Sequence, residues 1–151
     1  MKKLFLIKEI RSKEGELHFK RWRLISTPWF SIYIHGIYKE DEEAHLHDHP
    51  WDYTSIVLRG YFSERTLNYD VITDEKAKEW KSRRIEETVV GPSSVVRRKA
   101  ETFHKIQRLH SNYVYTLFFA GKKRRDWGYD VNGQWIDHVT YRKMKNENQL
   151  K

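Results

Sequence analysis

The sequence has no cysteine among its 151 residues, so it can form neither a disulfide nor a thiolate metal site. Any metal site must therefore use imidazole and carboxylate groups. Long apolar runs are absent as well. No run approaches the length needed to cross a bilayer, and Lys8 and Glu9 interrupt the N-terminal apolar residues too early for a secretory leader. From these absences we expect a cytoplasmic protein with no membrane partner.

The charge balance is basic, with 29 lysine and arginine residues, 21 acidic residues and a net charge of +8. Such a charge could attract phosphate groups, but it is common in ordinary soluble proteins. Three basic clusters, at 81–84, 97–99 and 122–125, fall where loops or strand ends are expected, and solvated turns or protected edge strands explain them. We expect a small-molecule partner, with nucleic acid and a homodimer kept as alternatives.

The chain has the length of one domain with a single core. Short runs rich in aromatic and β-branched residues recur, with little helical periodicity. We predict strands near residues 3–10, 16–25, 29–38, 44–48, 52–59, 61–69, 84–90, 94–98, 103–109, 112–120, 126–131 and 134–140. Closure into a barrel or a two-sheet jelly roll is the usual way to protect so many edges. The predicted fold class is all-β, with a barrel over residues 1–141 and a polar C-terminal tail over 142–151.

Two glycines mark predicted hairpin turns. Gly60 lies between two apolar segments, so we predict a hairpin that links 53–59 to 61–69. Asn132 and Gly133 supply the positive backbone angles of a tight hairpin turn. The stretch "TDEKAKEWKSRR", at 73–84, is charged and lacks proline and glycine, and we expect a short helix or an excursion over the barrel.

The most informative stretch is "EAHLHDHPWDY", at 43–53, in which His45, His47 and His49 occupy alternate positions. An extended backbone sends residues i and i+2 to the same face, roughly 6.6 Å apart, so His45 and His47 can converge on one ion. A helix would not bring them together, and Pro50 would disrupt a helix interior. The histidines are internal and separated, unlike a purification tag. We predict that His45 and His47 project from a strand end toward a metal, and a solvated polar face is the alternative.

A metal site needs three or four ligands, so further ligands must come from elsewhere in the sequence. Asp52 opens the strand after the turn and could point back toward the histidine pair. Glu64 can reach the same interior only if its strand face points inward. His104 begins a strand far along the chain, where a barrel could bring it opposite His47. We therefore predict His104 as the third histidine.

These residues give the chain a resemblance to the cupin superfamily. The family's first motif has a glycine, a gap, His-x-His, three or four residues, an acidic residue, six residues and a glycine. Its counterpart is "GIYKEDEEAHLHDHPWDYTSIVLRG", at 36–60, with His45 and His47 as the pair and Asp52 at the acidic position. The match departs from the family in having aspartate for glutamate and one extra residue in the last gap. A register shifted by two residues finds no carboxylate.

The second motif of the family has a glycine, five residues, Pro-x-Gly, two residues and a histidine. Its counterpart is "GPSSVVRRKAETFH", in which Gly91 and His104 are retained and residues 99–101 replace Pro-x-Gly. Together the two motifs span 36–104. The chain is also similar to small uncharacterised cupin-like proteins that carry "HDHPW", here 47–51, and a later Trp-Gly-aromatic segment, here 127–129. That subgroup supplies no activity.

The resemblance implies a double-stranded β-helix that binds a divalent first-row metal, which could be iron, manganese, zinc, nickel or copper. The implied ligands are His45, His47, Asp52 and His104. Three roles stay open for His49: hydrogen bonding to a ligand, a place on the surface of the turn, or metal binding instead of Asp52. Glu64 is the other candidate carboxylate.

Three functional classes follow. The first is a metal-dependent cupin enzyme, an oxygenase-like oxidoreductase such as a dioxygenase, which acts on a small polar or anionic molecule with Arg97 or Arg59 as substrate anchor. The second is a metal-independent sugar-nucleotide isomerase or epimerase, which would pair a histidine base with Tyr53 or Tyr115 as the acid. The third is a non-enzymatic binding module, for instance for nucleic acid, that uses the basic clusters and aromatic residues.

Overall fold

The computed structural model describes residues 5–73 and 79–150. In these ranges the chain forms strands and one helix: β1 (Phe5–Arg11), β2 (Leu17–Ser26), β3 (Ser31–Ile37), β4 (Tyr53–Arg59), β5 (Phe62–Thr73), β6 (Glu79–Val90), β7 (Val95–Arg98), β8 (His104–Leu109), β9 (Val114–Ala120), β10 (Gly128–Val131), β11 (Gln134–Asp137) and α1 (His138–Asn146). The predicted all-β class is confirmed. No helix in the described part is long and apolar enough to span a membrane.

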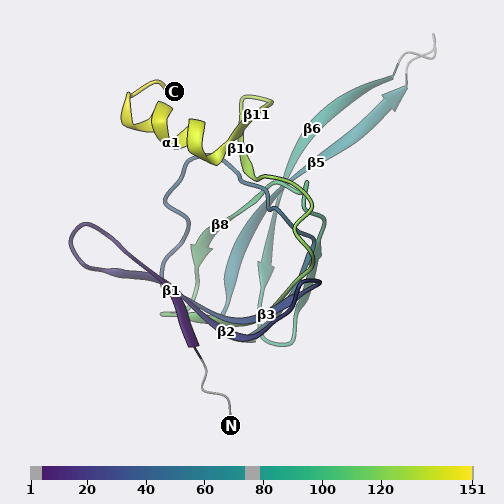
Figure 1. Ribbon diagram of the computed structural model, residues 1–151. Coiled ribbons are helices and arrows are strands. Elements are labelled where there is room, and N and C mark those ends of the chain that lie inside the picture. Colours follow the sequence, from purple (N-terminus) through teal and green to yellow (C-terminus); the bar gives the residue numbers. More distant parts are fainter. Residues whose placement is uncertain (1–4, 74–78, 151) are drawn as a thin grey trace.

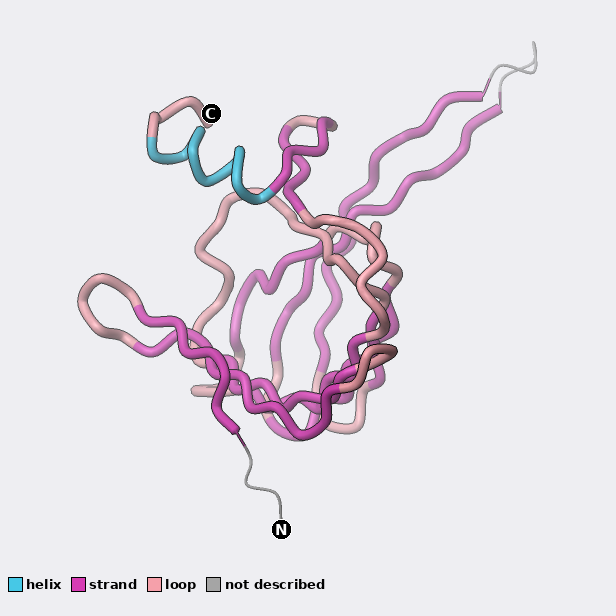
Figure 2. Tube along the Cα trace, viewed as in Figure 1, coloured by secondary structure: helices cyan, strands magenta, loops and turns pink. Residues whose placement is uncertain are grey.

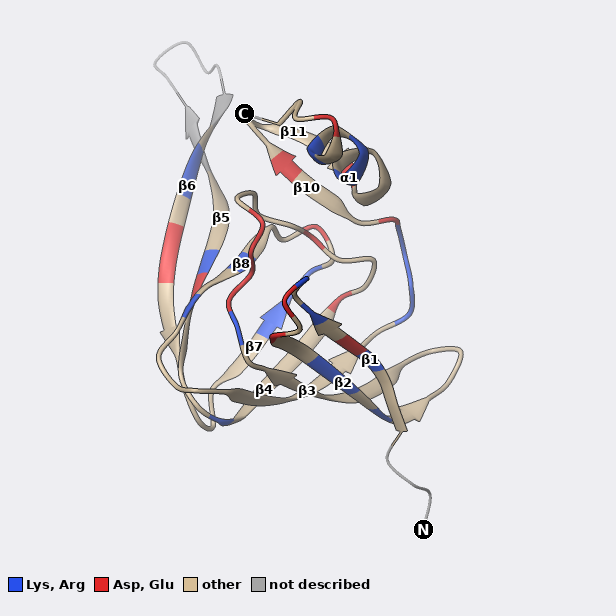
Figure 3. Cartoon of the chain, turned by 90° about the vertical axis from the view of Figure 1, so that its left-hand side faces the viewer, with Lys and Arg blue, Asp and Glu red and all other residues tan. Residues whose placement is uncertain are grey.

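The strands form two main antiparallel sheets that curve around a common interior (Figure 1). The larger sheet has the order β1-β2-β3-β9-β4-β7, and the smaller one has the order β6-β5-β8. β10 and β11 form a separate hairpin that lies with α1 at one end of the barrel (Figure 2). A view from the side shows this end opposite the larger sheet (Figure 3). β9 inserts between β3 and β4, so residues far apart in sequence line one wall.

The loop around His47 connects the smaller sheet to the β10–β11 hairpin. His47 forms isolated antiparallel bridges with His104 of β8 and with Tyr129 of β10. The bridge to His104 has both backbone hydrogen bonds, each with an N···O distance of 2.9 Å. The loop therefore lies between two strands and is held by ladder-type bonds on both sides, although it is too short to be a strand itself.

Apolar side chains fill the barrel at one end and leave space at the other. The main core cluster consists of Ile37, Val57, Phe62, Val90 and Val114, contributed by both sheets. Along β9 buried and half-buried residues alternate strictly, as expected for a strand with one face inward. The inward residue Val114 joins this core, whereas Thr116 and Phe118 line a cavity. One face of a single strand therefore serves both the core and the cavity.

Gly60 does not close a hairpin, in contrast to the prediction. β4 pairs with β7 and β9, whereas β5 pairs with β6 and β8, so the chain crosses from one sheet to the other at Gly60. Its φ is +85°, and a Cβ there would lie 2.3 Å from the carbonyl oxygen of Tyr113, so only glycine fits. The other predicted turn is confirmed, since β10 and β11 pair around Asn132 and Gly133, which have φ values of 53° and 89°.

Two further segments differ from their predictions. Residues 44–48 form no strand, and His47 alone makes bridges there. The stretch 73–84 continues the β5–β6 hairpin wherever it is described, with Thr73 opposite Glu79. Residues 74–78 lie outside the described residues. In both segments the pairing with neighbouring strands, and not the local composition, decides which residues form a strand.

The helix α1 replaces the end of the last predicted strand. The carboxylate of Asp137 accepts hydrogen bonds from the backbone N–H groups of Val139 and Thr140, which caps the first turn. The helix crosses the predicted boundary between the barrel and the tail at residue 141. Tyr141 is only 3% exposed, and Lys145, which lies in the expected tail, pairs with Glu43, so part of that tail contacts the domain.

Asp48 anchors the histidine-rich loop to the β10–β11 end of the barrel. Its side chain is only 1% exposed and makes an ion pair with Arg125. One carboxylate oxygen accepts a hydrogen bond from the backbone N–H of Gly128 at 2.7 Å, and the other accepts one from Trp135 Nε1 at 3.0 Å. A buried charge is tolerated when it is paired and hydrogen-bonded in this way.

We expect Asp48→Ala to lower the free energy of unfolding by about 3–5 kcal/mol, because it leaves the Arg125 charge, the buried N–H of Gly128 and the indole N–H of Trp135 without their acceptor. The matched control is Glu87→Ala, which removes an exposed carboxylate paired with Arg65 and should cost no more than about 1 kcal/mol. Denaturant titration followed by circular dichroism measures both. Equal losses for the two variants would contradict the anchoring role of Asp48.

Candidate metal centre

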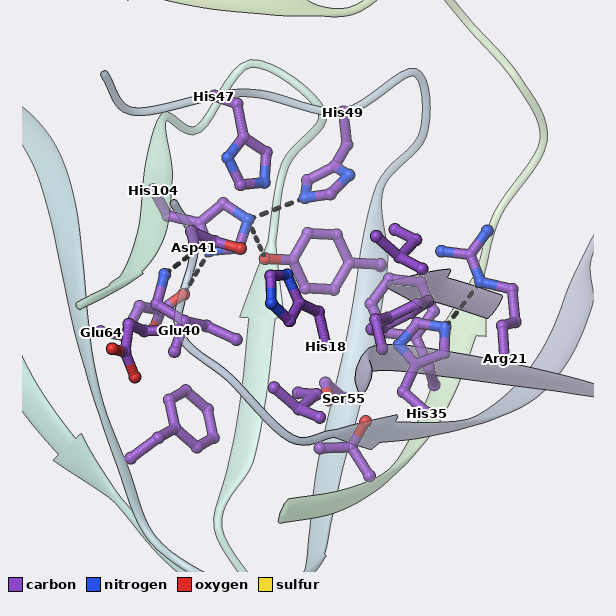
Figure 4. A pocket seen from close by; sticks show the side chains of 18 of the residues that line it. His18, Arg21, His35, Glu40, Asp41, His47, His49, Ser55, Glu64 and His104 are labelled. Atoms are coloured by element: carbon purple, nitrogen blue, oxygen red, sulfur yellow. Dashed lines mark hydrogen bonds and ion pairs between the residues drawn. The ribbon is translucent and has the colours of Figure 1, made fainter. Parts of the chain in front are cut away.

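Three histidines converge on one point at the cavity wall: His47 and His49 from the loop before β4, and His104 from the start of β8 (Figure 4). One ring nitrogen of each lies within 4.8 Å of the others. The backbone bridge between His47 and His104 places those two rings side by side, with centroids 4.8 Å apart. His49 follows two residues after His47, as extended chain requires for the same face. Its Nε2 lies 2.7 Å from Nε2 of His104.

The surroundings keep two of these imidazoles neutral. Burial lowers the pKa of His47 to about 4, and the charge of His104 adds to the decrease. Burial also holds the pKa of His49 well below its usual value, with His104 and His47 contributing next. Neutral imidazole is the form that binds metals, because its free nitrogen lone pair is the ligand. The site is therefore ready for a cation at neutral pH.

Glu64 fixes the orientation of His104. The Oε1 atom of Glu64 lies 2.7 Å from His104 Nδ1, and Oε2 accepts a hydrogen bond from Arg98 Nη2 at 2.7 Å. Burial alone would raise the pKa of Glu64, but the hydrogen bonds and charges of His104 and Arg98 outweigh it and lower the pKa. An ionised carboxylate only accepts, so Nδ1 of His104 carries the proton and Nε2 presents a lone pair to the other two histidines.

Tyr53 completes the polar contacts of His104. Its hydroxyl oxygen lies 3.3 Å from His104 Nε2, and the residue is only 5% exposed. Burial raises the pKa of Tyr53 well above its usual value, with the charge of Glu64 as the next cause. The phenol therefore keeps its proton at neutral pH and can donate it to a neighbouring acceptor. The sequence-based expectation had placed Tyr53 in the site as a candidate acid.

The histidines open onto a cavity of about 460 Å³ that occupies the barrel interior. This volume is in the range of small-molecule sites. Apolar and aromatic residues form much of its wall, among them Phe19, Phe62, Val96 and Phe118. On the far side from the three histidines lie Arg21 and His35, joined by a 2.9 Å hydrogen bond from Arg21 Nε to His35 Nε2 (Figure 4).

Two of the ligands implied by the first cupin motif lie outside the three-histidine group. His45 points toward α1, where its Nδ1 lies 2.8 Å from the hydroxyl of Tyr141. Asp52 is turned outward, and its carboxylate accepts hydrogen bonds from the backbone N–H of Ala100 and from Arg124. The structure thus brings together His47, one of the expected pair, with His49 and the expected third histidine.

The candidate anchors Arg97 and Arg59 do not line the cavity. Both are exposed, and the guanidinium of Arg59 lies over the ring of Tyr113. Arg98, which follows Arg97 in the chain, points inward on the same face of β7 as Val96, because side chains alternate along a strand. Tyr115 lies on the outer face of β9, where its hydroxyl is 3.0 Å from that of Tyr38.

The cavity is also lined by four residues to which no motif in the sequence points: Arg21, His35, Lys8 and His18. A usable signal was present in the alternation of the second and third strands. Arg21 lies two residues after Phe19, and His35 lies two residues before Ile37, so each shares a face with a cavity or core residue. What the sequence could not supply was which face of each strand points inward.

Comparison with known proteins supports the fold. No protein-family model matches the chain, and no curated protein matches it. Among solved structures, a cupin-2 domain from Rhodospirillum rubrum superposes with a TM-score of 0.55 at 11% identity, over 97% of this chain and 84% of that one. The polyketide cyclase RemF from Streptomyces resistomycificus gives 0.53 at 18% identity, over 97% and 92%.

A third similar structure is Fe(II)-HppE with an alternative substrate, with a TM-score of 0.53 at 10% identity. The match covers 79% of this chain and 56% of the HppE chain, so this chain spans little more than half the length of that protein. At such low sequence identities the similarity is one of backbone fold alone. This chain has the antiparallel jelly-roll fold of cupin superfamily proteins.

Proposed function

We propose that this chain is a metal-binding cupin enzyme that holds a divalent first-row ion through His47, His49 and His104. It acts on a small polar or anionic molecule inside the barrel, in reactions of the oxygenase-like oxidoreductase class. The observation that carries the proposal is the convergence of three ring nitrogens within 4.8 Å at the wall of the cavity inside the barrel. Imidazole ligands with open positions suit iron, manganese, zinc, nickel and copper.

The donor set fits such an ion. Burial keeps His47 and His49 neutral, and Glu64 orients His104 so that its Nε2 lone pair faces them. The Glu64 carboxylate is already engaged by His104 and Arg98, so it supports a ligand and is not itself counted as one. The iron in the structurally similar HppE supports iron as the first ion to test.

A bound divalent ion would supply Lewis acidity and a position for oxygen or substrate. The chain's own residues do the rest. Aromatic walls such as Phe118 lower the polarity around a bound molecule, which strengthens electrostatic contacts inside the cavity. Tyr53 stays protonated and lies beside His104, where its hydroxyl can donate a proton to a reacting oxygen.

One observation favours a second candidate, a metal-independent isomerase or epimerase. Glu64, His104 and Tyr53 form a continuous chain of contacts at 2.7 and 3.3 Å, which is an arrangement of carboxylate, base and acid. This function needs no ion. The stoichiometry of bound metal therefore separates the two candidates.

The nucleic-acid alternative gains little from the distribution of charge. In the view of Figure 3, basic residues are spread over β2, β6, β7 and the loop before β10, with acidic residues between them. Several arginines of the three basic clusters are used in ion pairs with acidic residues of the chain: Arg83, Arg98, Arg124 and Arg125. Such internal pairing reduces the charge available for phosphate contacts.

We expect untagged protein reconstituted with Fe(II), Mn(II) or Zn(II) to contain close to one ion per chain by elemental analysis. His47→Ala, His49→Ala and His104→Ala should each reduce the content to background, because each removes one of three ligands. His45→Ala is the matched control, since it removes a histidine of the same loop that faces Tyr141, and it should retain the ion.

The outcome for His49 and His45 distinguishes two ligand sets. Loss of metal in His45→Ala with retention in His49→Ala would return the site to the motif-based set with Asp52. No ion in the unsubstituted protein, after reconstitution with each metal, would favour the isomerase candidate. Circular dichroism of every variant establishes that the fold is retained.

We expect Glu64→Gln to weaken metal affinity by about 10–100-fold, because an amide cannot replace the charged acceptor that orients His104. Competition with a metal chelator measures the affinity. The control is Glu87→Gln, which alters an exposed carboxylate paired with Arg65 and should leave the affinity unchanged. Equal affinity in Glu64→Gln and the parent protein would show that Glu64 has no part in the metal site.

A further inference from the structure

Two cations lie next to each other at the side of the cavity away from the three histidines. Lys8 of β1 and Arg21 of β2 are direct partners across the antiparallel pair, so their side chains project from the same face. Both line the cavity, with Arg21 half-buried and Lys8 exposed at the opening. Like charges at opposed positions destabilise a sheet, so their placement calls for a compensating anion.

Neither cation has an acidic partner among the residues that the structure describes. The polar contact of Arg21 is with the neutral ring of His35, at 2.9 Å, and its guanidinium also lies over the rings of Tyr33 and Phe19. Lys8 makes no ion pair in the described part of the chain. The next cross-strand pair, Glu9 and Lys20, forms an ion pair of its own.

The arrangement lowers the pKa values of three groups. Burial and then Arg21 lower the pKa of Lys8. Burial is the main cause of the lowered pKa of Arg21, and burial followed by Arg21 and Lys8 holds the pKa of His35 well below its usual value. Each of these effects disfavours positive charge, and a bound anion would relieve all of them.

A wall of stacked rings runs from this cationic pair to the candidate metal ligands. His35 lies 4.5 Å from Phe118 between ring centroids, and Phe118 stacks on Tyr53 at 4.7 Å with an interplanar angle of 23°. Tyr53 in turn contacts His104. These rings pack on one another and form an aromatic wall, against which another planar ring can pack in edge-to-face or offset contacts.

Three cavity-lining residues carry buried polar atoms without a hydrogen-bond partner: His18 Nε2, Trp51 Nε1 and Thr116 Oγ1. Thr116 is the direct neighbour of His35 across β3 and β9. Trp51 lies beside His49, with ring centroids 6.5 Å apart. Buried polar groups are almost always satisfied, so unpaired ones along a cavity indicate positions for the polar atoms of a ligand or of ordered water.

We propose that the cavity binds a planar organic carboxylate, with its carboxylate group held by Arg21 and Lys8 and its ring packed against Phe118 and Tyr53. The opposite end of the ring then faces the three histidines. The guanidinium of Arg21 offers the planar fork that matches a carboxylate. A volume of about 460 Å³ admits a compound of one or two rings. The role of this site in catalysis rests on the proposed function. The binding of the carboxylate does not depend on it.

The three carboxylates of residues 41–43, at the cavity rim, do not neutralise the cationic pair. Glu42 lies 3.5 Å from His18 and Glu43 pairs with Lys145. Asp41 accepts a hydrogen bond from the backbone N–H of Ile106. These carboxylates are occupied by other partners, so they leave Lys8 and Arg21 free for an external anion.

Four probes separate the features of the ligand. Benzoate has the ring and the charge, benzamide has the ring alone, acetate has the charge alone, and inorganic phosphate is an anion without a planar body. We expect benzoate to bind the full chain at least about tenfold more tightly than the other three, measured by ligand-observed NMR with and without bound zinc. Comparable binding of acetate or phosphate would overturn the aromatic part of the proposal.

Arg21→Gln should weaken benzoate binding by about tenfold or more, because it removes a charged donor. Arg23→Gln is the matched control, since it removes the same charge from an exposed position of the same strand and should change the affinity less than about twofold. If Arg21→Gln fails to fold, Lys8→Gln takes its place, and weaker benzoate binding is again expected. Unchanged binding in the folded variant would overturn the proposal.

The result is independent of the metal test. Loss of zinc in His104→Ala together with Arg21-dependent benzoate binding supports both assignments. Absence of metal with Arg21-dependent benzoate binding contradicts the metal enzyme and leaves the anion site standing. Stoichiometric zinc with no benzoate binding contradicts the anion site and leaves the metal site standing.

Discussion

The candidate site depends on one pair of backbone hydrogen bonds. In each of them the N–H of one residue, His47 or His104, donates to the C=O of the other, with an N···O distance of 2.9 Å. Such a bridge fixes the two Cα atoms at the spacing of neighbouring strands and turns both side chains to the same face. The residues are 57 positions apart in sequence, so only tertiary pairing can bring them together. The buried carboxylate of Asp48 holds the loop on its other side by bonding to the β10–β11 hairpin. Rigid placement of this kind suits a metal site, because ligands that are already positioned cost less entropy to bring together on binding.

The alternation of histidines in the sequence predicted much of this site but not its register. In extended chain His45, His47 and His49 would share a face, and the structure follows that rule only from His47 onward. His45 precedes the bridged residue, lies outside any strand and turns toward Tyr141 of α1. The family motif favoured the earlier register because it offered Asp52 as a carboxylate. Local periodicity cannot choose between the two registers, because the choice depends on where the loop first pairs with β8.

The fold itself was accessible from composition and alternation, since short aromatic and β-branched runs specified most strands. What could not be derived was the pairing. Gly60 separates two apolar strands, as a hairpin glycine would, yet it carries the chain from one sheet to the other. A positive φ at this glycine is compatible with a hairpin turn and with a crossing between sheets, so it does not distinguish them. Likewise, Arg97 and Arg98 are indistinguishable by type, and only the inward face of β7 selects Arg98 as the partner of Glu64. These choices depend on long-range contacts that no local pattern encodes.

The two ends of the cavity are electrostatically coupled. Burial and the two neighbouring histidines are the main causes of the lowered pKa of His49, and the charge of Arg21 adds to them, so the cation at one end of the cavity acts on a histidine at the other. A divalent ion held by neutral imidazoles would keep its full charge and be disfavoured by Arg21 and Lys8. An anion bound between them reverses this effect, because it lowers the positive potential at both ends. By thermodynamic linkage the benefit is reciprocal: whatever free energy the anion adds to ion binding, the ion adds to anion binding. Such coupling would favour the complex that holds both the ion and the substrate over complexes that hold only one of them. The complex with both bound is the one in which the reaction can take place.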